Sequence, residues 1–131
     1  MQENPPRILV VEDVPLVRAV LAMRLESEGF SVITARDGVE ALDQARDGAP
    51  DLVLLDLMLP RLPGERVCQE LRADPRTRAL PIVVLSARVG DAERLRALAS
   101  GADAFIAKPY DVERLLVEIR ARLATARRAA A

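Results

Sequence analysis

The sequence predicts an α/β fold, namely a doubly wound, five-stranded parallel sheet made from five strand–helix units. Five short apolar runs carry the strand signal: Ile8–Val11, Ser31–Ala35, Leu52–Leu55, Ile82–Leu85 and Ala104–Ala107. The first, third and fourth runs are almost continuously apolar, which is typical of strands covered on both faces. A helical pattern follows each run, so that one unit takes about 25 residues. This alternation favours parallel strands joined by right-handed crossovers, with helices on both sides of the sheet.

The first two helices have recognisable starts and ends. Asp13 is a candidate N-cap for the first helix, and Gly29 ends it. The expected apolar stripe of this helix consists of Val17, Val20, Leu21 and Leu25. Asp37 and Glu40 have the spacing of a capping box at the start of the second helix. Its expected inner residues are Ala41, Leu42 and Ala45, and Gly48 ends it.

The other three helices also have recognisable start or stop signals. A shorter helix over residues 65–73 stops before Pro75. Asp91 opens the fourth helix, and Asp111 opens the last. We expect the fourth helix to bury Leu95, Leu98 and Ala99 and to end at Gly101, and the last to bury Leu115, Leu116, Ile119 and Leu123.

The 131 residues are enough for one domain. We expect the folded domain over residues 7–124 and a flexible N-terminus over residues 1–6. Residues 125–131 would form a frayed helix end or the start of a linker. Because the net charge is −1 and both signs are interspersed, we expect no direct contact with nucleic acid. No signal peptide or membrane span is recognisable in the sequence. The single cysteine, Cys68, cannot form a disulfide within the chain, which is typical of a reducing cytosol, and we expect it to be a small packing residue. We therefore predict a cytoplasmic protein without membrane contact.

The basic residues are distributed unusually. The sequence has 18 arginines, one lysine (Lys108) and no histidine. The missing histidine excludes a histidine base, a histidine-ligated metal and a phosphohistidine within this sequence. A single lysine among so many arginines indicates that position 108 has a specific requirement for lysine.

Polar and charged residues stand at the ends of four predicted strands. Glu12 and Asp13 follow the first strand, Asp56 the third, Ser86 the fourth and Lys108 the fifth. Ligands of such folds bind at this edge of the sheet. Neither the glycine-rich dinucleotide motif nor a P-loop is present. Carboxylates gathered without histidine or cysteine favour a hard cation such as Mg²⁺, for which Mn²⁺ could substitute. An ionised aspartate needs no base to act as a nucleophile, so the site suits formation of an aspartyl phosphate.

Four segments carry a family resemblance: ILVVEDVP, DLVLLDLMLPRLPG, PIVVLSA and GADAFIAKPY. They resemble the signature segments of response-regulator receiver domains of two-component signalling, and the likeness extends from Arg7 to Leu123. It implies a flavodoxin-like sheet with strand order 2-1-3-4-5. It also implies that Asp56 is the phosphoacceptor and that Mg²⁺ is held by the Asp13 and Asp56 carboxylates and the Met58 backbone carbonyl, with Glu12 acting through water.

The same resemblance implies roles for residues at the last two strands. Lys108 would pair with phosphoryl oxygens, and its bond to Pro109 would be cis. Ser86 would be the switch hydroxyl, and Phe105 the aromatic side chain that moves with it. Met58 and Arg88, each two residues past a site residue, would either tune dephosphorylation or be simple loop residues.

The implied function is that of a signalling switch rather than a general enzyme, since it would catalyse only its own phosphorylation and dephosphorylation. The partners would be a sensor histidine kinase or a phosphotransfer protein, and a downstream protein or missing output domain. The output surface would be formed by the last two helices and the strand between them. A dimer is not predicted, because Ala104 and Glu118 replace an acidic residue and an arginine in one branch of the family. An aspartate-dependent phosphatase is disfavoured because Met58 stands where its second aspartate would be, and a binding module without phosphorylation is disfavoured because no site residue is missing.

Overall fold

A computed structural model describes residues 4–88 and 90–130 of the chain. Its strands are β1 (Arg7–Val11), β2 (Ser31–Ala35), β3 (Leu52–Asp56), β4 (Ile82–Ser86) and β5 (Ala104–Ala107). Its helices are α1 (Pro15–Ser27), α2 (Gly38–Asp47), α3 (Gly64–Ala73), α4 (Asp91–Ala99) and α5 (Val112–Ala130). The strands form one parallel sheet in the order β2-β1-β3-β4-β5. The predicted fold class and strand order are confirmed, and three strands are one residue longer than expected, at Arg7, Asp56 and Ser86.

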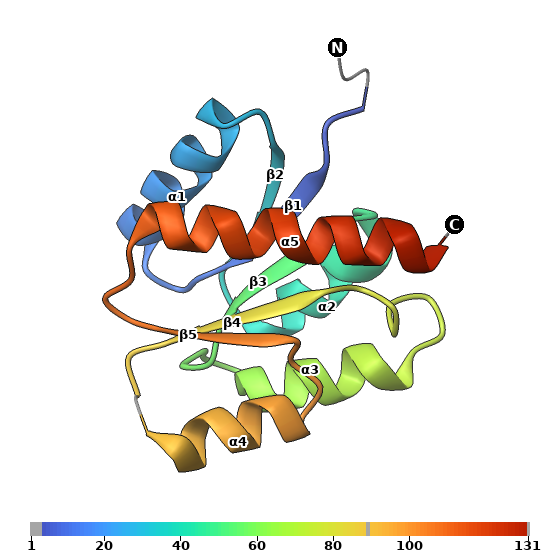
Figure 1. Cartoon of the computed structure of the whole chain (residues 1–131). Coiled ribbons are helices and arrows are strands. Elements are labelled where there is room, and N and C mark those ends of the chain that lie inside the picture. Colours follow the sequence, from blue (N-terminus) through green and yellow to red (C-terminus); the bar gives the residue numbers. More distant parts are fainter. Residues whose placement is uncertain (1–3, 89, 131) are drawn as a thin grey trace.

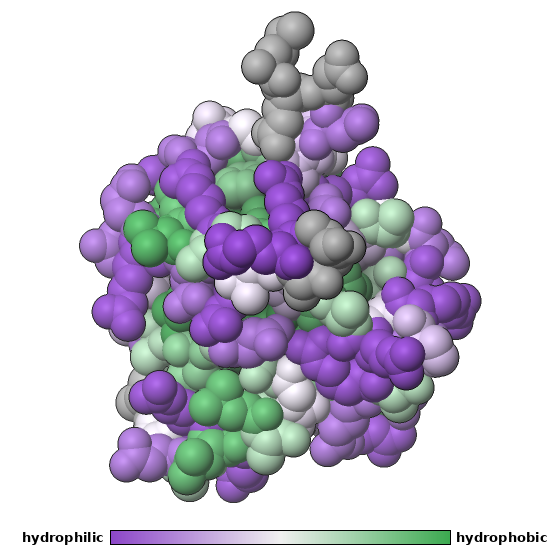
Figure 2. Space-filling view, turned by 45° about the vertical axis from the view of Figure 1, so that its right-hand side comes forward, coloured by the Kyte–Doolittle hydropathy of each residue, from purple (hydrophilic) through white to green (hydrophobic). Residues whose placement is uncertain are grey.

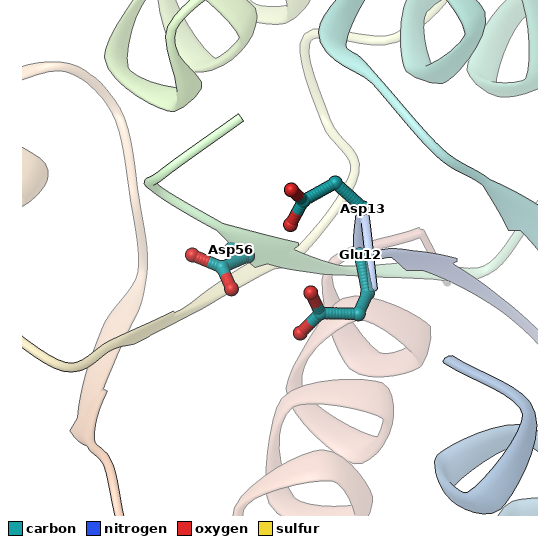
Figure 3. A group of neighbouring side chains, drawn as sticks. All are labelled: Glu12, Asp13 and Asp56. Atoms are coloured by element: carbon teal, nitrogen blue, oxygen red, sulfur yellow. The ribbon is translucent and has the colours of Figure 1, made fainter. Parts of the chain in front are cut away.

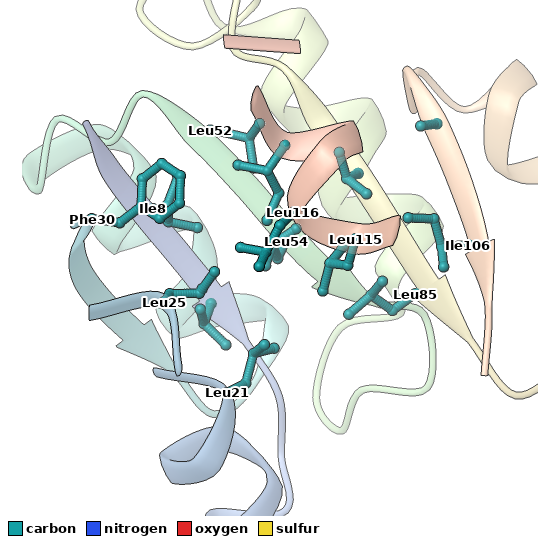
Figure 4. Packing of buried hydrophobic residues seen from close by; sticks show 14 of the residues in the cluster. Ile8, Leu21, Leu25, Phe30, Leu52, Leu54, Leu85, Ile106, Leu115 and Leu116 are labelled. Carbon is teal, nitrogen blue, oxygen red and sulfur yellow. The ribbon is translucent and has the colours of Figure 1, made fainter. Parts of the chain in front are cut away.

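The sheet lies between two helical layers (Figure 1), with α1 and α5 on one face and α2, α3 and α4 on the other. Successive strand residues point to opposite faces, so each strand contributes to two cores. On β1, Ile8 (labelled in Figure 4) packs with α1 and α5. Val10 lies in the same core, whereas Leu9 and Val11 pack on the opposite side. Both cores are strongly apolar, which explains why the sequence shows continuous rather than alternating apolar runs.

Helix α1 departs from its predicted pattern. Its N-cap is Val14 rather than Asp13, no side chain caps it, and a proline occupies its first turn. Leu21 and Leu25 are buried as predicted, whereas Val17 and Val20 are 42% and 58% exposed. The predicted apolar stripe is therefore buried at the two leucines and exposed at the two valines. Only the side of the helix that faces α5 and the sheet is covered, and this stripe is narrower than the apolar sequence pattern.

Helix α4 also buries less than predicted. Ala97 is its fully buried side chain, whereas Leu95, Leu98 and Ala99 are exposed, which corrects the expected inner face. Asp91 is the first helical residue, and Gly90 takes the N-cap position without a side-chain bond. The small alanine allows α4 to approach the short edge strand β5, and the leucines point outward. Apolar side chains accordingly gather at the bottom of the surface in Figure 2, where α4 lies in Figure 1.

Helices α2 and α5 agree with their predicted starts and inner faces, and α3 begins at Gly64, one residue before its predicted start. Asp37 caps α2 by accepting a hydrogen bond from the Glu40 amide at 2.8 Å. Asp111 accepts a bond from the Glu113 amide at 2.9 Å at the start of α5. Helix α5 buries Leu115, Leu116, Ile119 and Leu123, and α3 buries Val67, Cys68 and Leu71. Burial raises the pKa of Cys68 to about 12, as suits a packing residue.

The two ends of the chain bear on the predicted domain limits. Helix α5 continues to Ala130, so the segment beyond residue 124 is helical as far as the structure describes it. Of the expected flexible N-terminus, residues 1–3 lie outside the described part, as does residue 131 of the expected C-terminal segment. The limits of residues 7–124 for the domain stay a prediction. None of the described helices has the length and apolar character needed to cross a membrane.

Candidate functional site

The candidate site lies at the carboxyl edge of the sheet, where four strands end. Asp56 and Ser86 are the last residues of β3 and β4, Glu12 follows β1, and Lys108 follows β5. Because the strands are parallel and in register, their ends meet at one edge. The topology therefore brings together side chains that are far apart in the sequence.

Three carboxylates converge at this edge. Glu12, Asp13 and Asp56 each offer an oxygen, and these oxygens lie within 4.8 Å of one another. Figure 3 shows Glu12 and Asp13 projecting from the end of β1 towards the end of β3, where Asp56 lies. Glu12 and Asp56 are buried at 5% and 6% exposure, whereas Asp13 is open to solvent. Burial raises the pKa of Glu12, and bonds from the Val14 amide and Lys108 offset this only in part.

Lys108 joins two of the carboxylates. Its Nζ donates to Asp56 Oδ2 at 2.6 Å and to Glu12 Oε1 at 3.2 Å. Burial alone would lower the pKa of Lys108, but the bonds to Asp56 and Glu12 outweigh it and raise that pKa. The peptide bond from Lys108 to Pro109 is cis, and the Lys108 amide donates to the Ser86 carbonyl at 2.8 Å.

The loop after β3 holds Asp56 by its backbone. The Met58 amide donates to Asp56 Oδ1 at 2.8 Å, while the Met58 side chain is 49% exposed. Gly64 packs against this loop so closely that a Cβ there would lie 2.7 Å from Leu57 Cα. A side chain at position 64 would therefore displace the residue that follows Asp56.

The remaining predicted residues lie around this centre. The Ser86 side chain is fully buried, and its Oγ accepts a hydrogen bond from the Arg88 amide at 3.1 Å. Arg88 itself is exposed. Phe105 is half-buried, packs against the core under α2, α3 and α4, and borders a cleft of about 440 Å³ that Arg94 and Arg114 also line. Ala104 is buried, and Glu118 pairs with Arg122 on its own helix.

Sequence reasoning missed two contacts that hold the turn carrying Glu12 and Asp13. The Val14 amide donates to Glu12 Oε2 at 3.1 Å, and the Arg18 guanidinium donates to the Glu12 carbonyl at 2.9 Å. The place of Arg18 near the start of the helix could have suggested that it lies close to this turn. Nothing in the residue pattern, however, indicates that its side chain extends back to the end of the strand.

The donor set fits a hard divalent cation. Three carboxylates face one ammonium, so the site has an excess of negative charge even with Lys108 in place. No described residue forms an ion pair with Asp13, which leaves its exposed carboxylate free to bind. Oxygen ligands without sulfur or imidazole match Mg²⁺ or Mn²⁺ and not zinc.

Comparison with known proteins identifies the family to which the chain belongs. The family model of the response regulator receiver domain matches residues 8–120. The chain is 48% identical over 119 residues to response regulator MprA of Mycobacterium sp. strain KMS, covering 91% of this chain and 51% of that protein. It is 42% identical over 122 residues to the phosphate regulon transcriptional regulatory protein PhoB of Rhizobium meliloti, covering 93% and 54%. The crystal structure of a CheY-like receiver domain protein from Methanospirillum hungatei has a TM-score of 0.89 at 25% identity, covering 96% of this chain and 99% of that one.

The chain therefore belongs to the receiver domains of two-component response regulators, a family of signalling switches. It spans about half the length of the curated relatives that it matches.

Proposed function

We propose that Asp56 is the phosphoacceptor of this receiver domain and that the phosphoryl group comes from a phosphohistidine on a partner. The observation that carries the proposal is the placement of Asp56, a buried carboxylate at a strand end with an ammonium at 2.6 Å and two further carboxylates beside it. Since this chain has no histidine, the donor is a sensor histidine kinase or a phosphotransfer protein.

The reaction is a phosphoryl transfer between two side chains. A carboxylate oxygen of Asp56 forms a bond to phosphorus while the bond from phosphorus to the donor imidazole nitrogen breaks, and the imidazole keeps that electron pair. Lys108 then balances the new charge by pairing with a phosphoryl oxygen, since its Nζ already lies against Asp56 Oδ2. The Ser86 hydroxyl supplies a further donor once it turns from its bond with the Arg88 amide.

Mg²⁺ would be held by the Asp13 and Asp56 carboxylates and the Met58 carbonyl, with Glu12 acting through water. When bound, it supplies charge neutralisation between the carboxylates and the phosphoryl oxygens. Hydrolysis of the aspartyl phosphate resets the domain, and the exposed Met58 and Arg88 side chains control how readily water reaches it. The domain thus catalyses only its own phosphorylation and dephosphorylation.

The output follows from the movement of Ser86 and Phe105. A phosphoryl group adds nearly two negative charges near Ser86, and drawing the hydroxyl towards it vacates space for the Phe105 ring. Phe105 lies on β5 beside the cleft between α4 and α5, so its rotation changes the α4-β5-α5 surface. A downstream protein, or an output domain in a longer chain, reads that surface.

Intact-mass measurement after incubation with acetyl phosphate and Mg²⁺ tests the proposal. The wild-type chain gains one acid-labile phosphoryl group, and Asp56→Ala gains none. Asp51→Ala is the matched control, because Asp51 precedes the same strand at its opposite end and is exposed. Equal labelling of wild type and Asp56→Ala would refute the assignment.

A further inference from the structure

The turn between β1 and α1 carries two of the three carboxylates, yet few bonds hold it. Helix α1 has no side-chain cap, and the proline in its first turn has no amide to donate. Four hydrogen bonds to or from main-chain atoms hold the turn. The Glu12 amide donates to the Ala35 carbonyl at 3.0 Å, and the Val14 amide donates to Glu12 Oε2 at 3.1 Å. The Arg18 amide donates to the Val14 carbonyl at 2.9 Å, and Arg18 Nη1 donates to the Glu12 carbonyl at 2.9 Å. The amide bond reaches only Val14, so the guanidinium bond is the one of these four that ties the Glu12 carbonyl to the body of α1.

Arg18 is placed unusually for a cation next to an acidic cluster. It is half-buried, and no carboxylate of a described residue lies within ion-pair distance of its guanidinium. Its charge instead strengthens a hydrogen bond to a main-chain carbonyl. A positive charge near a cation site opposes the binding of Mg²⁺, so electrostatics alone gives no reason for an arginine at this position.

We propose that Arg18 is a positioning residue for the metal site. By holding the Glu12 carbonyl, its guanidinium fixes the backbone from which the Glu12 and Asp13 carboxylates project, and so keeps them directed towards Asp56. The inference deepens the proposed function and rests on it as far as Mg²⁺ is concerned. Residues that orient metal ligands without touching the metal commonly change its affinity by about 10-fold or more when removed.

The direction of the change in Mg²⁺ affinity distinguishes a positioning role of Arg18 from a purely electrostatic one. Arg18→Met keeps the aliphatic stem and removes the donor and the charge. If Arg18 acts by positioning, Mg²⁺ binds about 10-fold more weakly in isothermal titration of the metal-free chain. If it acts only as a nearby positive charge, its removal tightens binding. Arg24→Met is the matched control, because Arg24 lies on the same helix but pairs with Glu28 and Glu113, so its loss leaves Mg²⁺ affinity within about 2-fold.

A second measurement needs no metal. Hydrogen exchange by NMR in the metal-free chain reports the Glu12 and Val14 amides directly, and both lose protection in Arg18→Met but not in Arg24→Met. Unchanged protection, or Mg²⁺ affinity equal to or above wild type, would overturn the inference. If the wild-type chain binds no Mg²⁺, the proposed metal site is wrong, and the exchange of these two amides still decides whether Arg18 holds the turn.

Discussion

Replacing Asp13 by asparagine should stabilise the metal-free protein, because three carboxylates lie close together at the candidate site. At 4.8 Å, the upper limit of the separation between the three carboxylate oxygens, two unit charges repel by about 0.9 kcal/mol in water and by about 3.5 kcal/mol at an effective dielectric constant of about 20. Asp13 faces two such neighbours, and the ammonium of Lys108 offsets roughly one of them. Because Asp13 is exposed, the lower value applies, and Asp13→Asn gains about 1 kcal/mol in the free energy of unfolding. The helix loses no cap, since Asp13 does not cap α1.

Urea unfolding with and without Mg²⁺ measures this effect. In the presence of a chelator, the midpoint of Asp13→Asn rises by about 0.5 M. With Mg²⁺ at about ten times the wild-type dissociation constant, wild type gains about 1.4 kcal/mol and the variant gains less, so the difference shrinks or reverses. Asp43→Asn, at an exposed position on α2, serves as the control and shows neither change. A lower midpoint for Asp13→Asn in chelator would refute the account of charge crowding.

Two further predictions concern Lys108 and Asp74. Lys108→Arg keeps the charge and the fold but weakens the response of the α4-β5-α5 surface to acetyl phosphate, measured as NMR shift changes; an unchanged response would show that any cation suffices. The side chain and amide of Arg76 lower the pKa of Asp74 to about 2. The stabilisation from this carboxylate is therefore complete above its ordinary pKa of about 3.9 and is lost as pH falls towards 2. Acid unfolding of Asp74→Asn should accordingly be less pH-dependent over this window, and parallel curves for variant and wild type would contradict the shift.

The strands were more predictable than the helix faces, for a physical reason. A central strand of a parallel sheet is covered on both sides, so a continuous apolar run predicts it without any choice of which face points inward. A helix on the surface of the sheet buries only the stripe that faces its neighbours, and apolar residues beside that stripe stay exposed. Val17 and Val20 on α1 and Leu95 on α4 extend the apolar pattern, but the structure leaves them in solvent. The pattern cannot give the width of the covered stripe, which depends on the contacts of α1 with α5 and of α4 with β5.

The candidate site was predictable to the extent that it follows from topology. Glu12, Asp56, Ser86 and Lys108 each end or follow a strand, and parallel strands bring their carboxyl ends together, so their proximity needs no knowledge of side-chain conformation. Contacts that a helix residue makes with the preceding strand end, or with main-chain atoms, cannot be predicted from topology in this way. The bond from Arg18 to the Glu12 carbonyl depends on the direction in which α1 leaves the turn, and no residue type marks that direction.

The place of Lys108 explains why one lysine stands among 18 arginines. Its partners, Glu12 and Asp56, lie at the ends of different strands and are both buried, and the ammonium lies between an oxygen of each. A guanidinium binds best when two parallel N–H groups meet the two oxygens of one carboxylate, as a planar fork. An ammonium has no such preferred plane and is smaller, so it can bridge two carboxylates that approach from different directions. It can also turn from one oxygen to another in the proposed transfer of a phosphoryl group to Asp56. Arginine serves the surface ion pairs well, but at position 108 its size and planarity would separate the carboxylates that the site holds together.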